Sequence, residues 1–543
     1  MRKRNYIPIL YTILIFLVIF SFHSYQNLKA IVAPPSEKWG REVKIDKTPY
    51  KKAASLNINE ENIWILTAKE DRFTKTILEK ENGNIKEIQN IIIPGAALNK
   101  LVKYKGVEPY IFWTENYELY MSTKQESGDY TPKSLIAAEV KDFNIFSQNG
   151  QIVLAAAHNQ GLRYYKINEQ GAIAWGNEYP FDKAVHITAA LDDSGIFHTV
   201  SIRDISPMEK EIIYLLFSQG KWTLRSQKTE YVQVSNESIG NLEIGLDNEL
   251  AYIFYENNVW NSFGQTARTW YATVPLSQAG NSDMEFRLLT SHDTESSADV
   301  YVSEVNCPYL KQDTLNAVFI EKYWDETGEG FKILNTTFKD GKISGKTYST
   351  RILGWIKGID IAQYGKEEAL VFLQTAGEFK NDVWFTQTGE GYKEIVNKPV
   401  KQDYAVAMEN SISPYISGLV IALIRAFMFF PAVLWLLFVE FFEVRKFSFN
   451  PKLNYSVAIS IYMIIKVLTA NFYYGGLSYY MMPDFMKPMA IRYLIMLSIG
   501  FIAYFMAKTF KKNRTDMHII PEFLLFMLYD LLITVFLYGP YIT

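Results

Sequence analysis

The stretch AALDDSGIFHTVSIRD, residues 189–204, places two aspartates, a glycine and a histidine together in a chain of 543 residues that has six histidines. Asp192, Asp193 and His198 have side chains suited to acid–base or metal chemistry. A structural interpretation is simpler, because aspartates accept bonds from turn N–H groups and Gly195 tolerates a positive φ. The apolar residues around His198 would then form a strand. We therefore predict a turn followed by a β-strand.

A strand of this kind recurs seven times, with starts about 42 to 65 residues apart. The copies are IWILTAK at Ile63, YIFWTEN at Tyr110, IVLAAAH at Ile152, IFHTVSI at Ile196, LAYIFYE at Leu250, LNAVFIE at Leu315 and ALVFLQT at Ala369. Further strands follow each copy, usually through an N-G, D-G or Q-G turn that is typical of hairpins. This period predicts an all-β propeller of about seven blades, whereas a two-sheet sandwich would match the strand content but not the period.

The segment DDSGIFHTVSI resembles the D-x-x-G-x-φ-H turn-and-strand element of sialidase-like and WD-like propellers. The resemblance extends over about residues 55–398. The sequence lacks the S-x-D-x-G-x-T-W box of sialidases and a repeated W-D ending. The resemblance therefore implies the fold and transfers no active site.

The N-terminus has the layout of a signal anchor or of a cleaved signal peptide. Arg2, Lys3 and Arg4 precede about 17 apolar or nearly apolar residues, and only a weak small-residue cleavage pattern follows near Ala30 or Ala33. We favour the anchor. Further apolar runs long enough to span a bilayer extend roughly from Ile416 to Phe442, Tyr455 to Tyr473, Met489 to Phe510 and Pro521 to Tyr538. Pro431 interrupts the longest run, where we expect a kink.

Basic residues alternate with the apolar runs as the positive-inside rule requires. They occur at the N-terminus, in EVRKFSFNPK and in KTFKKNRTDMH, while the loop NFYYGGLSYYMMPDFMKP is poor in cations. This pattern places the N-terminus in the cytoplasm and puts both the propeller and the C-terminus outside a bacterial cell membrane. The predicted regions are an anchor over 1–30, a linker over 31–55, the propeller over 56–400, a linker over 401–415 and a four-helix transmembrane bundle over 416–543.

Composition excludes several classes of function. The net charge of −3 and the lack of a long basic run do not indicate nucleic-acid binding. Cys307 is the single cysteine, so no intramolecular disulfide and no multi-cysteine zinc site can form. His158, His186 and His292 fit no metal motif. We predict no metal and no cofactor.

Other polar and aromatic clusters have two interpretations each. Asp293, Glu295 and Asp299 could bind calcium, but a solvated insertion fits them better. Asp325, Glu326 and Glu329 are among many acidic residues from which a glycosidase pair could come. Tryptophans could form sugar platforms or partner hot spots, although packing between blades is the simpler role; they include Trp64, Trp113, Trp175, Trp222, Trp260, Trp270, Trp324, Trp355 and Trp384.

Three ionisable residues lie well inside the C-terminal apolar runs: Arg425, Lys466 and Asp530. A charge at the centre of a bilayer costs about 2.5–3.5 kcal/mol on insertion scales, so such residues usually face the bundle interior and find partners. They could line an ion, proton or substrate path. The alternative that we favour is a buried salt bridge from Asp530 to Lys466 or Arg425, which would fix the helix register.

These observations lead to one principal functional hypothesis and two alternatives. We expect a membrane-anchored propeller that binds or scaffolds a protein or a cell-envelope component and that catalyses no reaction itself. The first alternative is an extracellular glycan hydrolase with carboxylates in the propeller funnel. The second is a transport or signalling module regulated by the propeller. The step from fold to function is an analogy in each case.

Overall fold

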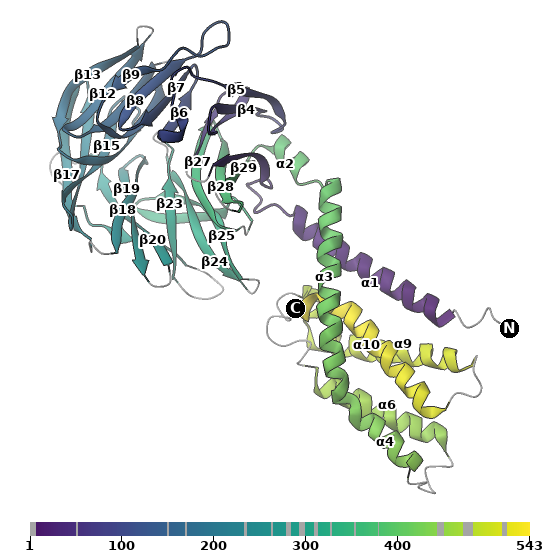
Figure 1. Cartoon of the computed structure of the whole chain (residues 1–543). Coiled ribbons are helices and arrows are strands. Elements are labelled where there is room, and N and C mark those ends of the chain that lie inside the picture. Colours follow the sequence, from purple (N-terminus) through teal and green to yellow (C-terminus); the bar gives the residue numbers. More distant parts are fainter. Residues whose placement is uncertain are drawn as a thin grey trace. The chain divides into compact units, whose positions relative to one another are not determined.

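The computed structural model (Figure 1) divides the chain into two compact units, residues 34–398 and residues 1–33 with 399–543. It describes residues 7–49, 53–148, 151–168, 171–232, 236–261, 264–277, 284–292, 299–308, 313–325, 328–351, 354–377, 380–441, 450–470, 482–512 and 518–542.

Residues 34–398 form a seven-bladed β-propeller, as predicted. Blade 1 is β2 (Ala54–Ile58), β3 (Asn62–Ala68), β4 (Phe73–Glu79) and β5 (Ile85–Ile91). Blade 2 follows a short 3-10 helix, η2 (Leu98–Lys100), and is β6 (Leu101–Val107), β7 (Tyr110–Glu115), β8 (Glu118–Thr123) and β9 (Ser134–Ala137). Blade 3 is β10 (Val140–Gln148), β11 (Gln151–His158), β12 (Gly161–Asn168) and β13 (Gly171–Pro180). Blade 4 is β14 (Ala184–Leu191), β15 (Phe197–Ser206), β16 (Glu209–Ser218) and β17 (Lys221–Tyr231).

The remaining blades complete the ring. Blade 5 is β18 (Glu237–Leu246), β19 (Leu250–Asn261), β20 (Gly264–Pro275) and β21 (Arg287–Leu288). Blade 6 has five strands, β22 (Thr290–His292), β23 (Asp299–Asn306), β24 (Leu315–Asp325), β25 (Gly328–Lys339) and β26 (Lys342–Tyr348). Blade 7 is β27 (Ile356–Tyr364), β28 (Glu367–Thr375), β29 (Lys380–Gln387) and, from the start of the unit, β1 (Val43–Pro49).

The N-terminal strand closes the propeller. β1 pairs antiparallel with β29, from Val43 opposite Phe385 to Pro49 opposite Lys380. The short helix α2 (Glu390–Val396) follows β29 and buries Tyr392, whose hydroxyl donates to the carbonyl of Arg41 at 2.8 Å. The propeller therefore begins earlier than the predicted boundary at residue 56, because closure needs a strand from the segment 31–55, which we expected to be a linker.

The seven repeated strands occupy equivalent places in the blades. They are β3, β7, β11, β15, β19, β24 and β28. Each is the second strand of a four-stranded unit, which in blade 6 consists of β23 to β26, with β22 as an additional edge strand. The first strands, β2, β6, β10, β14, β18, β23 and β27, contact one another in a closed ring around the central channel. Apolar clusters fill the spaces between neighbouring blades; for example, Tyr164 of blade 3 lies 5.0 Å from Phe197 of blade 4, between ring centroids. The apolar repeat is thus the contact surface between adjacent sheets.

The second unit consists of helices. They are α1 (Ile7–Val32), α3 (Lys401–Ala426), the 3-10 turn η3 (Phe427–Phe429), α4 (Phe430–Phe441), α6 (Pro451–Leu468), the 3-10 turn η4 (Asp484–Met486), α9 (Met489–Lys512) and α10 (Ile519–Ile542). Helix α3 begins within the segment 401–415, which we expected to be a linker. Near Pro431, where we expected a kink, the 3-10 turn η3 separates α3 from α4, and Pro431 is the second residue of α4.

Three helical segments of the described chain are long and apolar enough to cross a membrane: Leu10–Val32, Met489–Lys512 and Ile519–Gly539. A shorter apolar segment covers Phe427–Phe441. The bundle core is rich in aromatic residues and methionines, among them Tyr462, Met496 and Phe526. Helices α3 and α10 approach closely at Gly418, where an added Cβ would lie 2.8 Å from the Cα of Gly539. Small residues allow such close backbone packing between apolar helices.

Candidate functional site

The histidine motif of residues 189–204 is architectural. Asp192 caps the turn between β14 and β15, where its Oδ1 accepts bonds from the backbone N–H groups of Ser194 at 2.9 Å and Ile196 at 2.8 Å. His198 is buried on β15 and lies between Asp192 (Nε2 to Oδ2, 3.3 Å) and Tyr214 (Nδ1 to hydroxyl, 2.5 Å). Both ring nitrogens of His198 are therefore used inside the blade.

The other predicted clusters give little support for a site. Within the described part of the chain, no three His, Cys, Asp or Glu side chains come together in a way that could hold a metal ion. Asp293, Glu295 and Glu326 lie outside the described residues, and for Asp299, Asp325 and Glu329 the structure describes the backbone alone.

Most tryptophans contribute to packing. Trp64 and Trp113 are buried in the cluster between blades 1 and 2, and Trp175 and Trp222 pack in the cluster between blades 3 and 4. Trp260 and Trp355 are more exposed, with exposed fractions of 45% and 54%, although the Trp355 ring centroid lies 5.0 Å from that of Phe331. Trp260 lies on β19 of blade 5 and Trp355 directly precedes β27 of blade 7, so they do not form a shared platform within one sheet.

Two of the three predicted intrabundle charges form a salt bridge. Lys466 on α6 places Nζ 2.8 Å from both carboxylate oxygens of Asp530 on α10. The hydroxyl of Tyr462 donates to Asp530 Oδ2 at 2.6 Å, and Lys466 Nζ also donates to Thr534 at 3.3 Å. Both charged side chains are 1% exposed. The pair is thus enclosed and supported by neighbouring hydroxyl groups.

The third predicted residue, Arg425, lies in the last turn of α3, and its side chain is outside the described residues. A glycine on α9 allows close packing near the pair. A Cβ at Gly500 would lie 2.7 Å from Met463 Sδ and 3.7 Å from Asp530 Oδ1. Any larger residue at Gly500 would displace the Met463 side chain.

A second set of charges, which we did not predict, lines the propeller channel. Lys105 on β6 bonds both carboxylate oxygens of Asp360 on β27 at 2.9 Å and so joins blade 2 to blade 7. Lys103, also on β6, bonds Asp142 on β10 at 2.7 Å. Asp142 Oδ2 in turn lies 3.6 Å from His186 Nδ1 on β14. These contacts link the first strands of four blades.

The channel shifts the pKa values of its acids in opposite directions. Burial opposes the ionisation of Asp142, but the nearby charges of Lys103 and His186 hold its pKa well below the usual range. Burial raises the pKa of Glu243 on β18 to about 8, against the attraction of Lys103 and Lys105. Thr188 on β14 donates to Glu243 Oε2 at 3.2 Å. At neutral pH the channel therefore holds an ionised aspartate and a mostly protonated glutamic acid.

Glu304 on β23 is a further unusual acid. Burial, and then repulsion from the carboxylate of Glu256, raise its pKa to about 7. Its backbone N–H donates to Glu256 Oε2 at 2.7 Å, and its own carboxylate accepts from the N–H of Gly358. Its φ of 48° is unusual for a residue other than glycine. Backbone strain and a shifted pKa often coincide at functional sites.

A cavity of about 630 Å³ opens where the first strands end. Strands of blades 1, 2, 3, 4 and 7 contribute to it, and Lys105 is one of the lining residues. The lining is mixed: apolar side chains such as Leu56, Val107 and Ile361 lie beside the polar side chains of Asn57, Ser147 and Gln363. A cavity of this size with a few convergent polar groups is typical of sites for small ligands. We call it the channel-mouth cavity.

The sequence contains a signal for the channel that we did not use. The first strands of blades 2, 3 and 4 carry polar residues two positions apart, as Lys103 and Lys105, Asp142 and Asn144, and His186 and Thr188. Side chains at i and i+2 of a strand lie on the same face. Polar pairs at the same place in successive repeats therefore indicate a face that is turned toward a polar channel. On β18 of blade 5, Asn241 and Glu243 show the same spacing, whereas Asp360 on β27 has Gly358 and Ala362 two positions away and lacks such a pairing.

No protein-family model and no curated protein matches the sequence. Among solved structures, the propeller is similar to an ulvan lyase, a polysaccharide lyase of a new family, at 10% identity and a TM-score of 0.39, over 63% of this chain and 95% of the other. It is also similar to the N-terminal domain of Nup159 (8% identity, TM-score 0.34, 65% and 96% coverage). A third similar structure is an endo-arabinase from Bacteroides thetaiotaomicron, at 11% identity and a TM-score of 0.28, over 46% of this chain and 94% of the other. The likeness does not extend to a substrate or a site.

Proposed function

We propose that the chain is a binding protein of the bacterial cell membrane, with the propeller outside the cytoplasm and a cell-envelope component bound in the channel-mouth cavity. The observation that carries the proposal is the cavity itself, about 630 Å³ and built jointly by the first strands of several blades. Its amide, hydroxyl and charged groups, the last including Lys105 and Glu108, suit a polar ligand, and its apolar side chains suit the flat face of a sugar or a short peptide.

The membrane placement in this proposal is supported by the apolar helices and by the alternation of basic loops. A ring of first strands is a rigid support for such a site, because each strand is fixed by its own blade. Ligand binding would then require little rearrangement of the backbone.

Site-specific photo-crosslinking in native membranes tests this proposal. A photoreactive amino acid at Ser147, an exposed residue that lines the channel-mouth cavity, should capture an envelope component. The matched control carries the same group at Ile173, which is 50% exposed on the outer strand β13 of the same blade. Capture from Ser147 alone supports the proposal. Equal capture at both positions, or none at Ser147, contradicts it.

A second candidate function is glycan hydrolysis, which a specific pair of acids favours. Glycosidases combine a protonated carboxylic acid with a carboxylate. In the channel, Glu243 has a pKa of about 8, and Asp360, which interacts with it electrostatically, is held in a salt bridge with Lys105. The test is the release of reducing sugar from envelope polysaccharides by the purified chain. Activity that both Glu243→Gln and Asp360→Asn abolish would establish this function in place of simple binding.

A further inference from the structure

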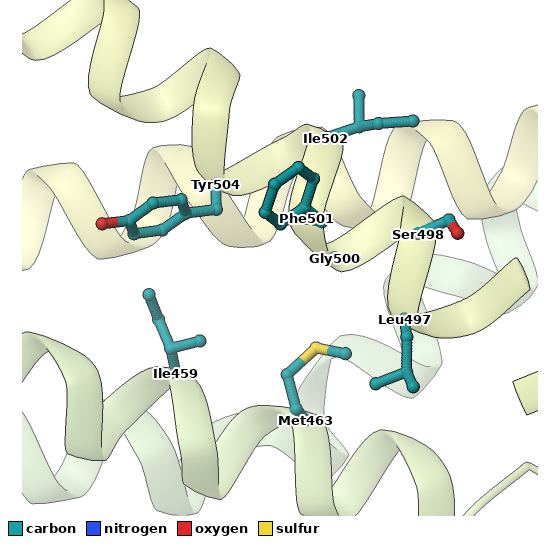
Figure 2. Close-up of a pocket in the computed structure, with 8 residues that line it drawn as sticks. All are labelled: Ile459, Met463, Leu497, Ser498, Gly500, Phe501, Ile502 and Tyr504. Carbon is teal, nitrogen blue, oxygen red and sulfur yellow. The ribbon is translucent and has the colours of Figure 1, made fainter. Parts of the chain in front are cut away.

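A cleft between two helices of the bundle is the strongest feature that the proposed function leaves unused (Figure 2). Its volume is about 520 Å³. In Figure 2, Ile459 and Met463 point from α6 toward α9, and Leu497 points from α9 toward α6. Its lining residues are Ile459, Met463, Leu497, Ser498, Gly500, Phe501, Ile502 and Tyr504.

The cleft is apolar and open to the surroundings of the bundle. Leu497 and Phe501 are 51% and 64% exposed. The Ser498 hydroxyl donates to the carbonyl of Leu494 at 2.8 Å, so its hydrogen is used within the helix. The lack of a side chain at Gly500 leaves room at the base of the cleft, since a Cβ there would collide with Met463. The surface of the cleft therefore suits a hydrocarbon chain.

Positive charge lies next to one end of the cleft. Lys508 follows Tyr504 by one turn of α9, and its Nζ lies 5.6 Å from the centroid of the Tyr504 ring and 4.4 Å from that of Tyr455 on α6. Lys508 Nζ also lies 2.8 Å from Glu522 Oε1 on α10, and Lys511 bonds the other oxygen of Glu522. Two ammonium groups share one carboxylate, so the cluster retains a net positive charge.

Both lysine side chains are 36% exposed, so an anion can still reach them. The sequence predicts that these residues lie on the cytoplasmic side, because both belong to the basic segment KTFKKNRTDMH, residues 508–518. Tyrosines between an apolar surface and lysines are the arrangement found at the boundary between hydrocarbon and headgroups. A cluster of basic residues at this level attracts anionic headgroups.

We infer that α6 and α9 form a site for an acidic phospholipid, with one acyl chain in the cleft and the headgroup phosphate at Lys508 and Lys511. Charge complementarity favours this occupant over a second copy of the chain, whose apolar helix would leave the lysines without an anion. The site rests on the proposed membrane placement, but it does not depend on what the propeller binds.

Native mass spectrometry of the full chain in mild detergent tests the inference, with phosphatidylglycerol as the probe and phosphatidylcholine as the zwitterionic comparison. We expect one phosphatidylglycerol to be retained in preference to phosphatidylcholine. Lys508→Gln should weaken retention about fivefold, as expected for the loss of one lysine near an anionic headgroup. Lys512→Gln is the matched control, since Lys512 is exposed on the same helix. Equal retention of both lipids, or equal weakening by both variants, overturns the inference.

A second pair of variants tests the acyl-chain part and does not disturb Glu522. Ser498→Trp should fill the cleft and reduce retention of phosphatidylglycerol, whereas Leu494→Trp, at a position 60% exposed outside the lining, should leave it unchanged. Equal retention by the two variants overturns the site, and so does a lipid-free dimer as the main species. Failure of the crosslinking at Ser147 would leave these results unaffected, so the two proposals can fail separately.

Discussion

The helical bundle and the propeller both enclose charged side chains, but they do so in different ways. In the bundle, Lys466 and Asp530 form one pair whose side chains are 1% exposed and whose neighbours Tyr462 and Thr534 complete the bonding. In the propeller, the charges extend over several blades, and Lys103 and His186 remain 44% and 35% exposed. One arrangement is closed and the other is open to the channel.

The difference separates a structural role from a binding role. A closed pair is surrounded by its own partners, so we expect its main effect to be on helix register and not on ligand binding. An open network holds partly hydrated groups in fixed positions beside a cavity, so a ligand can interact with them without first breaking the fold. This contrast predicts which charges control stability and which control binding.

Breaking the closed pair should have the largest effect. Asp530→Asn and Lys466→Met each leave one buried group without its charged partner, and each should reduce the free energy of unfolding by about 3–5 kcal/mol. The double variant should recover most of that loss, because a neutral pair needs no compensation. The measurement is thermal unfolding of the full chain in detergent, followed by the circular dichroism of the helices.

The same cycle can contradict the structural role. If the double variant is no more stable than the worse single variant, the two residues do not act as a pair. If protein levels are normal in all variants but a transport or signalling activity is lost in each, including the double variant, the pair belongs to a pathway instead.

Breaking the open network should have a smaller effect on stability. Lys105→Met removes the cation that bonds both carboxylate oxygens of Asp360. Asp360 would still accept a hydrogen bond from the backbone N–H of Leu56, which lies 2.8 Å from its Oδ2. Because Lys105 is 17% exposed, we expect a loss of about 1–3 kcal/mol, less than for a fully enclosed pair. Unfolding by urea, followed by tryptophan fluorescence, measures the propeller.

Lys44→Met is the matched control for this change. Lys44 pairs with Asp382 at 2.7 Å on the outer strands of blade 7, but it is 39% exposed, so its loss should cost about 0–1 kcal/mol. Equal losses for the two variants would show that the channel position of Lys105 has no special importance.

The sequence predicted the part of the fold that depends on local periodicity. The seven apolar strands and the turn at Asp192 follow from alternation and turn chemistry, and all are present. The closing strand β1 was missed, because VKIDKTP resembles an exposed polar segment and becomes a strand only through its pairing with β29. A partner more than 300 residues away leaves no local signal.

The same limit applies to the candidate sites. Lys466 and Asp530 were found because a charge inside an apolar run is conspicuous. Lys105 and Asp360 were not, because charges in a soluble region are common and these two are 255 residues apart. Their importance arises from the ring of first strands, which brings distant blades to one axis.

Removing an acid from the open network should have the smallest effect at acidic pH, where Glu243 is protonated, and should show a characteristic pH dependence. The folded propeller raises the pKa of Glu243 from an ordinary 4.5 to about 8, so the folded state binds this proton more tightly than the unfolded state does. The stabilisation is complete below about pH 4.5 and is lost as the pH rises toward 8. Glu243→Gln cannot ionise and should escape this loss.

The difference in melting temperature, Glu243→Gln minus wild type, should therefore be small at pH 5 and should grow by a few degrees toward pH 8. The matched control is Glu87→Gln, an exposed glutamate on β5, for which the difference should stay constant. A constant difference for Glu243→Gln as well would mean that water in the channel hydrates this carboxylate fully. The Glu243 carboxylate would then be as accessible to water as the Lys103 side chain. A protonated acid would no longer be available in the channel for catalysis.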